Sequence, residues 1–142
     1  MSSTHYHIAS TNDFIPIILD IINQKYPKTV VLQGDLGAGK TSFVRSFINQ
    51  LYDNTIVSSP TFTLMNIYHI NNLTIHHFDL YRMSSIEEVL EWGFEEFVTE
   101  CDFAFVEWAE RAWELIPSPY TLINLKHGES ETERTLNISI IT

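Results

Sequence analysis

The hydrophobic positions along this chain follow patterns typical of strands in some segments and of helices in others. Short continuous apolar runs at residues 30–32 and 103–106 are typical of strands that are buried on both faces. Two other segments repeat apolar residues at helical spacing, which predicts amphipathic helices. The members of these two stripes are Phe14, Ile17, Ile18, Ile21 and Ile22, and then Phe43, Val44, Phe47, Ile48 and Leu51.

The segment before the first apolar run predicts an edge strand followed by a helix. Residues 3–9 alternate weakly between polar and apolar side chains, as a strand with one exposed face does. One of the polar residues 11–13 is expected to cap the helix. Pro16 falls in its first turn, where a missing N–H costs little, and the helix is expected to end before Pro27.

Polar turns separate further elements in the rest of the chain. Four segments have strand-like patterns, at residues 64–70, 73–78, 120–126 and 136–141. Asn71-Asn72 predicts a tight hairpin between the first two. A short helix is expected to begin at Ser84 or Ser85 and to end at Gly93, and residues 109–115 are also expected to be helical. Helices alternating with strands predict an α/β fold.

One loop between the first buried strand and the second helix carries a strong chemical signal. The sequence GDLGAGKT at residues 34–41 matches the phosphate-binding loop pattern G-x-x-x-x-G-K-[ST]. The glycines let backbone N–H groups point at an anion, and the following helix adds its partial positive charge. Lys40 is expected to contact the terminal phosphates, and Thr41 to bind magnesium. The loop therefore predicts a site for a nucleoside triphosphate with Mg²⁺.

Length and composition favour one domain in a reducing compartment. The 142 residues are 44% hydrophobic, enough for a single core over residues 1–142. Cys101 is the only cysteine, so no internal disulfide can form. No apolar run approaches the roughly 20 residues that span a bilayer, and no secretory signal is expected at the N-terminus. We therefore expect a cytoplasmic protein without membrane contact.

The charge of the chain argues against direct binding to nucleic acid. The formal net charge is −10, and only eight residues are Lys or Arg. Because nucleic-acid binding depends largely on neutralising phosphates, a basic protein partner is the better expectation. Residues 87–114 hold ten acidic side chains and one basic side chain, Arg111. This segment is either a solvated acidic face or a docking face for a basic partner.

Phosphate-loop enzymes need a carboxylate at the end of a second buried strand, close to the magnesium. Glu107 follows the cleaner apolar run, so the pattern favours it as the strand-end acid. Asp79 follows a mixed run interrupted by two histidines, and it remains a candidate for orienting the attacking water or a metal-bound water. We expect both acids at the phosphate end of the sheet, where their charges repel until magnesium binds.

Two further sets of polar residues lie near these acids. Residues 58–63 are either a loop that enters a strand or a switch segment in which Thr61 senses the γ-phosphate and magnesium. His76 and His77 are neighbours in a predicted strand, so their side chains point to opposite faces and cannot share one metal. Hydrogen-bonded or exposed histidines are expected there.

Four segments, in this order, resemble the TsaE (YjeE) family: GDLGAGKTSF, SPTFTL, HFDLYR and VEWAER. The resemblance covers about residues 8–134. It implies a mixed α/β sheet flanked by helices and a weak ATPase that uses ATP and Mg²⁺. It also implies a role in making threonylcarbamoyladenosine (t6A) in tRNA, through the proteins TsaB and TsaD rather than by direct contact with tRNA.

The resemblance also implies roles for individual residues. The phosphates would be held by the loop and the start of its helix. The residues assigned to nucleotide binding are Gly34, Asp35, Gly37, Ala38, Gly39, Lys40, Thr41, Ser42, Thr61, Thr11 and Arg134. Thr41 and Glu107 would hold magnesium, and Asp79, Glu107 and Lys40 would take part in catalysis. Trp108 would lie beside the site.

Three other functions remain open at this point. A small-molecule kinase usually needs several anion-binding arginines, and this chain has few basic residues. A GTP-dependent switch usually carries an N-K-x-D segment, which is absent from the sequence. A structural role without nucleotide would require the substitution Lys40→Ala to leave the function intact.

Overall fold

The computed structural model describes residues 3–52, 57–61 and 63–142. Within them, one seven-stranded mixed sheet has the order β1-β7-β6-β2-β5-β4-β3. The central strands β6, β2, β5 and β4 run parallel, and β1, β7 and β3 are antiparallel to their neighbours. The strands are β1 (Ser3–Ile8), β2 (Thr29–Gln33), β3 (Met65–Ile70), β4 (Leu73–Asp79), β5 (Phe103–Glu107), β6 (Tyr120–His127) and β7 (Arg134–Ile141).

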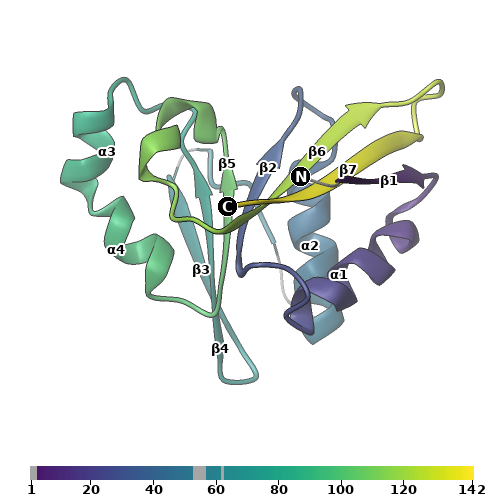
Figure 1. Cartoon of the computed structure of the whole chain (residues 1–142), viewed down its shortest axis with the longest axis horizontal. Helices are drawn as coiled ribbons and strands as arrows, with labels where there is room; N and C mark the ends of the chain where they lie inside the picture. Colours follow the sequence, from purple (N-terminus) through teal and green to yellow (C-terminus); the bar gives the residue numbers. More distant parts are fainter. Residues whose placement is uncertain (1–2, 53–56, 62) are drawn as a thin grey trace.

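Helices cover both faces of this sheet, so the α/β class predicted from the pattern is confirmed (Figure 1). The α-helices are α1 (Ile15–Ile22), α2 (Lys40–Leu51), α3 (Ile86–Trp92) and α4 (Phe94–Thr99). One core cluster joins α1 and α2 to one face of the sheet. A second cluster joins α3 and α4 to the other face.

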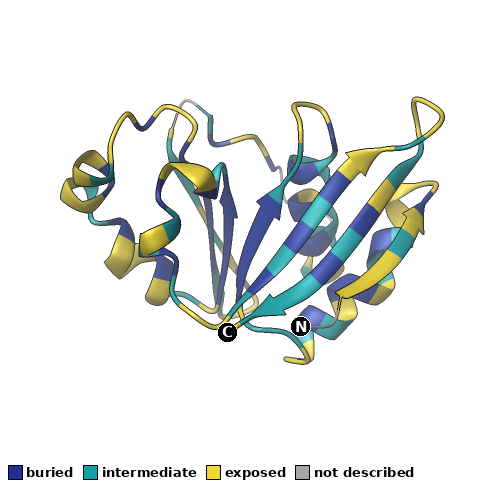
Figure 2. Cartoon of the chain, turned by 45° about the horizontal axis from the view of Figure 1, so that its top comes forward, coloured by how far each residue is buried: buried dark blue, intermediate teal, exposed yellow. Residues whose placement is uncertain are grey.

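The central strands lie in the interior because their residues are apolar on both faces. Every residue of β5 is buried, and the first four of β2 are buried too (Figure 2). On the α2 face, the ring of Phe47 packs edge-on against Phe103 and Phe105, with ring centroids 5.1 and 4.8 Å away. The continuous apolar runs of the sequence are therefore fully buried strands, as predicted.

The predicted turn between β3 and β4 is confirmed. Asn71 and Asn72 have φ angles of 50° and 68°, a left-handed backbone that asparagine tolerates better than most residues. The hairpin pairs Ile70 with Leu73. The pair Asp53-Asn54, whose sequence predicts another turn, lies outside the described residues.

Two helix predictions differ from the structure. The first helical segment begins one residue earlier than predicted, with Ser10 as N-cap of a 3₁₀ turn (Thr11–Phe14). The Asp13 carboxylate accepts hydrogen bonds from the N–H groups of Ala9 and Ser10, which fixes that start. The segment 109–115, predicted to be one helix, forms two 3₁₀ turns, Ala109–Arg111 and Trp113–Leu115. The helix is interrupted because Ala112, between the two turns, has a φ angle of −157°, which is outside the helical region.

Among the described residues, no helix is long and apolar enough to cross a membrane.

Candidate functional site

The loop from residue 34 to residue 39 joins the end of β2 to the start of α2. Gly37 and Gly39 have φ angles of 77° and 110°, in the left-handed region that favours glycine. Gly39 is the N-cap of α2, so Lys40 is the first helical residue. A cavity of about 190 Å³ opens beside this loop and helix. Its lining residues are Leu36, Gly37, Gly39, Lys40, Thr41, Ser42, Ser59, Thr61, Asp79, Glu107 and Trp108.

Gly34 is needed for a different reason, a close approach between two backbones. A Cβ atom on Gly34 would lie 2.5 Å from the carbonyl oxygen of Leu125 on β6. Such contacts do not occur in folded proteins, and a backbone oxygen in the middle of a sheet has little room to move. The first glycine of the motif therefore allows the loop to pass next to β6.

Two contacts hold the Lys40 side chain in place. Its Nζ donates a hydrogen bond of 2.6 Å to the carbonyl oxygen of Gly34, and it lies 4.3 Å from the centroid of the Trp108 ring. Lys40 is 7% exposed, so its charge is largely shielded from water. A cation in this position is attracted both by the carbonyl dipole and by the indole face.

Asp79 and Glu107 end neighbouring parallel strands, β4 and β5, at the same level of the sheet. Each is 3% exposed, and both line the cavity. Both acids therefore lie at the loop end of the sheet, as expected. The sequence pattern favoured Glu107 over Asp79, whereas the strand register gives them equivalent places.

Glu107 is held by two side chains from other elements. Its Oε2 accepts a hydrogen bond from the Thr41 hydroxyl, with the oxygens 3.3 Å apart. The same oxygen lies 2.5 Å from Nε2 of His77 on β4. The backbone carbonyl of Glu107 accepts from the N–H of Leu80. These contacts place the carboxylate directly beside the first turn of α2.

Asp79 has its own set of partners. Its Oδ2 accepts a hydrogen bond of 3.0 Å from the Thr61 hydroxyl, and its Oδ1 accepts one of 2.9 Å from the N–H of Tyr81. The hydroxyl groups of Ser59 and Thr61 are 2.7 Å apart. The carboxylate thus joins the segment around Thr61 to the end of β4. Phe62 lies outside the described residues.

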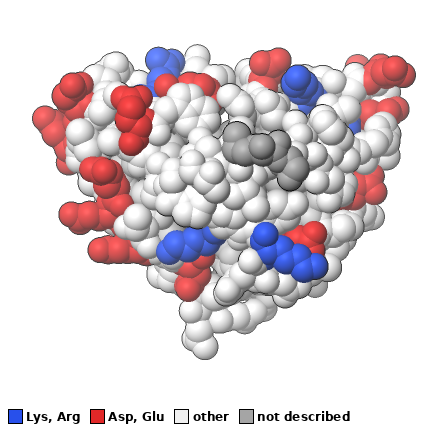
Figure 3. Space-filling view, in the orientation of Figure 1, with Lys and Arg blue, Asp and Glu red and all other residues white. Residues whose placement is uncertain are grey.

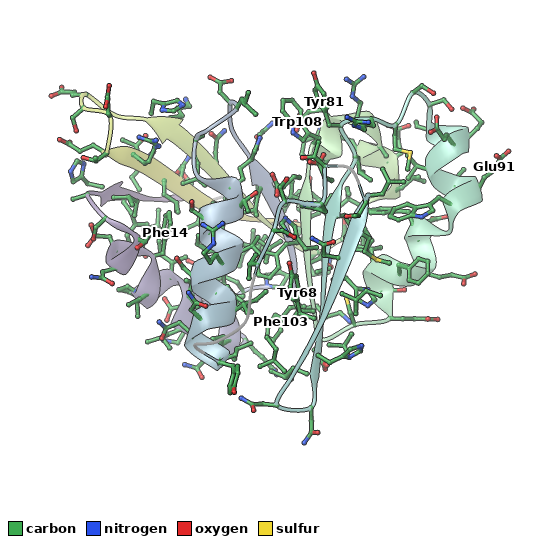
Figure 4. All side chains as sticks on the ribbon, turned by 180° about the vertical axis from the view of Figure 1, so that it is seen from behind. Phe14, Tyr68, Tyr81, Glu91, Phe103 and Trp108 are labelled. Carbon is green, nitrogen blue, oxygen red and sulfur yellow. The ribbon has the colours of Figure 1, made fainter. Side chains whose placement is uncertain are left out.

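Aromatic rings close one side of the site. Trp108 directly follows β5 and has a left-handed backbone, with a φ of 59°. Its ring centroid lies 4.8 Å from that of Tyr81, and the two rings lie together just beyond the strand ends (Figure 4). The guanidinium of Arg111 lies 5.6 Å from the centroid of the Tyr81 ring. Trp108 is therefore held between a ring and the Lys40 ammonium.

A second cavity, of about 370 Å³, adjoins the loop on the side of β1 and β7. Thr11 and Arg134 both line it, together with Gly37, Gly39 and Ser42. The pairing of Ile8 with Arg134 between β1 and β7 brings these two distant segments together. Arg134 donates a hydrogen bond of 3.2 Å from Nη2 to the carbonyl oxygen of Gly37.

The sequence of the chain matches the model of a family described as "Threonylcarbamoyl adenosine biosynthesis protein TsaE" over residues 8–136. The chain belongs to the TsaE family. The TsaE protein of Rickettsia felis is 45% identical over 98 residues, which cover 68% of this chain and 57% of that protein. The TsaE protein of Haemophilus influenzae is 34% identical over 114 residues, covering 80% and 72% of the two chains.

The fold agrees with a solved structure. The crystal structure of Bacillus subtilis YdiB superposes with a TM-score of 0.79 at 26% identity. The match covers 99% of this chain and 87% of that one. The TsaE protein of Bacillus subtilis is 39% identical over 107 residues, covering 75% of this chain and 66% of that protein. The predicted mixed sheet flanked by helices is therefore confirmed.

The residues assigned to nucleotide binding by resemblance to TsaE lie around three cavities, except Ala38, whose side chain lies in the core. Gly37, Gly39 and Ser42 line both cavities described above, whereas Lys40, Thr41 and Thr61 line only the smaller one. Ala38 is fully buried, so its side chain packs in the core behind the loop.

Gly34 and Asp35 line a third cavity of about 540 Å³, on the side of β6, with Trp108 as a shared wall. Neither residue lines the cavity next to Thr41. Gly34 and Asp35 contribute to the site through their backbone carbonyl groups. The Gly34 carbonyl accepts a hydrogen bond from Lys40, and the Asp35 carbonyl accepts one from the N–H of Ala38.

Three contacts in this TsaE site were missed from the sequence. They involve His77, Ser59 and the backbone N–H of Tyr81. Strand alternation does place His77 on the face of Asp79, two residues before it, and that signal could have led to it. The other two depend on loop conformation, for which the sequence gives no pattern.

Proposed function

We propose that this chain binds ATP with Mg²⁺ beside the 34–39 loop, hydrolyses it slowly, and acts in the cytoplasm with the TsaB and TsaD proteins to form t6A in tRNA. The observation that carries the proposal is the meeting of Lys40, Thr41, Asp79 and Glu107 around one cavity. The pathway comes from the names of the relatives, each a "tRNA threonylcarbamoyladenosine biosynthesis protein TsaE".

The loop and Lys40 bind the phosphate chain. Backbone N–H groups of the loop and the start of α2 attract anions, and Lys40 adds a full positive charge. Because the Lys40 side chain is already held by Gly34 and Trp108, little rotamer freedom is lost when a phosphate replaces the carbonyl as its partner.

Thr41 and Glu107 fit a magnesium site. Both offer oxygen atoms, which Mg²⁺ prefers, and the two oxygens are 3.3 Å apart. Mg²⁺ usually takes one or two protein ligands and completes its shell with phosphate oxygens and water. The bound ion supplies charge neutralisation on the phosphates during transfer.

Asp79 orients the attacking water. Its carboxylate accepts hydrogen bonds from Thr61 and from the Tyr81 N–H, which fix its rotamer toward the cavity. A fixed acceptor beside the terminal phosphate holds a water in line for attack. The contact with Thr61 also links the carboxylate to the segment around Thr61, which would act as a switch if it responds to the γ-phosphate.

Slow turnover by the chain alone follows from its shortage of cations at the site. Lys40 is the only basic residue that the described part of the chain contributes to the cavity lining. An arginine supplied to related phosphoryl transfer reactions accelerates them by roughly 10³- to 10⁵-fold. A partner protein is therefore expected to increase the rate.

The charge distribution supports an indirect role in tRNA modification. Acidic side chains gather on the side of the molecule formed by α3 and α4 (Figure 3). The whole chain has a formal net charge of −10, so it repels the phosphates of tRNA. We therefore expect the partner proteins, rather than this chain, to contact tRNA.

The test is t6A formation reconstituted from purified TsaB, TsaD and this chain. We compare the wild type with Lys40→Ala and Glu107→Gln, and we use Glu129→Gln as a matched control. Glu129 is exposed in the turn between β6 and β7, outside the acidic segment 87–114. Lys40→Ala and Glu107→Gln are expected to stop modification over many turnovers, and Glu129→Gln to sustain it. Sustained modification by both site variants contradicts the proposal.

A further inference from the structure

The two adjacent histidines of β4 have separate environments. His76 faces α4, where its Nδ1 lies 2.7 Å from the carbonyl oxygen of Phe97. His77 faces the α2 side, on the same face of β4 as Ile75 and Asp79. Its ring is fully buried.

His77 makes its polar contact with the Glu107 carboxylate. Nε2 lies 2.5 Å from Oε2, and the same oxygen accepts the Thr41 hydroxyl at 3.3 Å. In the part of the chain that the structure describes, Nδ1 of His77 is buried and has no hydrogen-bond partner. Among the described residues, the ring of His77 therefore contacts Glu107 through Nε2 and no second polar group through Nδ1.

Packing alone does not account for a histidine at this position. The neighbours on the same face of the sheet, Ile75 and Phe105, are apolar and fully buried. A buried polar ring costs free energy unless it is hydrogen-bonded, and one of its two nitrogens has no described partner. An apolar side chain would avoid that cost, so the contact with Glu107 is the feature that distinguishes histidine here.

We propose that His77 is a positioning residue for the magnesium site, an inference that rests on the proposed function of Thr41 and Glu107. An imidazole with a proton on Nε2 donates to Oε2 and fixes the carboxylate rotamer beside the Thr41 hydroxyl. A free glutamate side chain would instead sample several rotamers. Removing a hydrogen-bond partner that orients a metal ligand typically lowers the affinity for the metal by about 10- to 100-fold.

The experiment measures how the affinity for ATPγS, a slowly hydrolysed analogue, depends on free Mg²⁺, using calorimetry on the full chain. His77→Leu removes the donor. His77→Gln keeps an N–H donor at a similar reach. His76→Leu removes the neighbouring ring on the opposite face and serves as the matched control. Titrations in the presence of a chelator give the affinity without Mg²⁺, which reports on folding and on the phosphate loop alone.

We expect His77→Leu to shift the Mg²⁺ midpoint upward by about 10- to 100-fold, with the affinity in chelator unchanged. His77→Gln and His76→Leu should keep the midpoint within about threefold of the wild type. An unchanged midpoint in His77→Leu overturns the inference. An equal shift in His77→Leu and His77→Gln also overturns it, because the ring shape rather than the donor would then matter.

Two further outcomes are kept distinct. If His77→Leu does not fold, His77→Asn replaces it, since its amide stops short of Glu107; a wild-type midpoint in His77→Asn overturns the inference. A wild type that binds no ATPγS, or binds it independently of Mg²⁺, contradicts the proposed function itself. A wild type with Mg²⁺-dependent binding, combined with an unshifted His77→Leu, contradicts only the role of His77.

Discussion

Asp79 and Glu107 occupy paired positions at the ends of two neighbouring parallel strands, and each is 3% exposed to solvent. Their carboxylates have different partners, Thr61 for one and Thr41 with His77 for the other. The same strand register therefore gives two acids with separate orientations. This separation is the basis for assigning one to the attacking water and the other to magnesium.

Asp79→Asn tests the water-orienting role. The amide keeps the size of the side chain and can still bond to Thr61 and to the Tyr81 N–H, so nucleotide binding should be preserved. We expect the rate of ATP hydrolysis to fall by about 10²- to 10⁴-fold, with the ATPγS affinity unchanged within about twofold. Single-turnover hydrolysis and calorimetry measure the two quantities. Hydrolysis at the wild-type rate removes Asp79 from the mechanism.

Phe47→Ala tests the core between α2 and the sheet. The fully buried ring packs against Phe103 and Phe105, so its loss leaves a cavity. The free energy of unfolding should fall by about 3–5 kcal/mol. Leu19→Ala on α1 is the control, because Leu19 is 43% exposed, and a change of about 1 kcal/mol or less is expected. Urea denaturation measures both, and equal losses would contradict the packing described here.

Gly34→Ala tests the close approach of the phosphate loop to β6. The new Cβ would lie 2.5 Å from the Leu125 carbonyl oxygen, so the loop or the strand must shift. We expect a loss of about 1–3 kcal/mol in the free energy of unfolding, together with weaker ATPγS binding. Thermal denaturation and calorimetry measure these effects. A variant with wild-type stability and affinity would show that the loop does not need this approach.

Cys101 gives a pH-dependent prediction. Burial raises the pKa of its thiol from the ordinary value of 9.0 to about 11, against the opposing effect of the nearby Lys28 ammonium. The folded chain should therefore react with iodoacetamide at about pH 8 roughly 100-fold more slowly than the denatured chain, since the thiolate is the reactive form. The rate should keep rising up to about pH 11.

The same shift affects stability in a defined pH range. Below pH 9.0 the thiol is protonated in both the folded and the unfolded chain, so the contribution to stability is fully present. Between 9.0 and about 11 the unfolded chain loses its proton first, so the free energy of unfolding decreases as the pH rises. Cys101→Ser should lack both effects. An alkylation rate that levels off near pH 9 would contradict the buried thiol.

The parts of this protein that could be predicted are those fixed by neighbouring residues. The buried strands at 30–32 and 103–106 and the loop at 34–41 each carry their pattern within a few positions. The hairpin at Asn71-Asn72 is also local, because its two residues set the backbone of the turn.

The parts that could not be predicted depend on which strands become neighbours. The mixed pattern of β4 is explained by His77, whose partner Glu107 lies 30 positions away in the sequence. Asp79 lies opposite Glu107, at the same level of the sheet, only because β4 pairs with β5. Arg134 reaches the loop at Gly37 because β7 pairs with β6, which pairs with β2, the strand before the loop, and sequence spacing does not reveal this order.

The central claim is that the loop at residues 34–41 binds the phosphates of ATP. The most direct test is calorimetric titration of the wild type and of Lys40→Ala with ATPγS in the presence of Mg²⁺. We predict saturable binding to the wild type, and an affinity at least about tenfold lower in Lys40→Ala, because the variant loses the ammonium group that the Gly34 carbonyl holds beside the loop. No heat of binding with the wild type, or equal affinity in the two proteins, would contradict the claim.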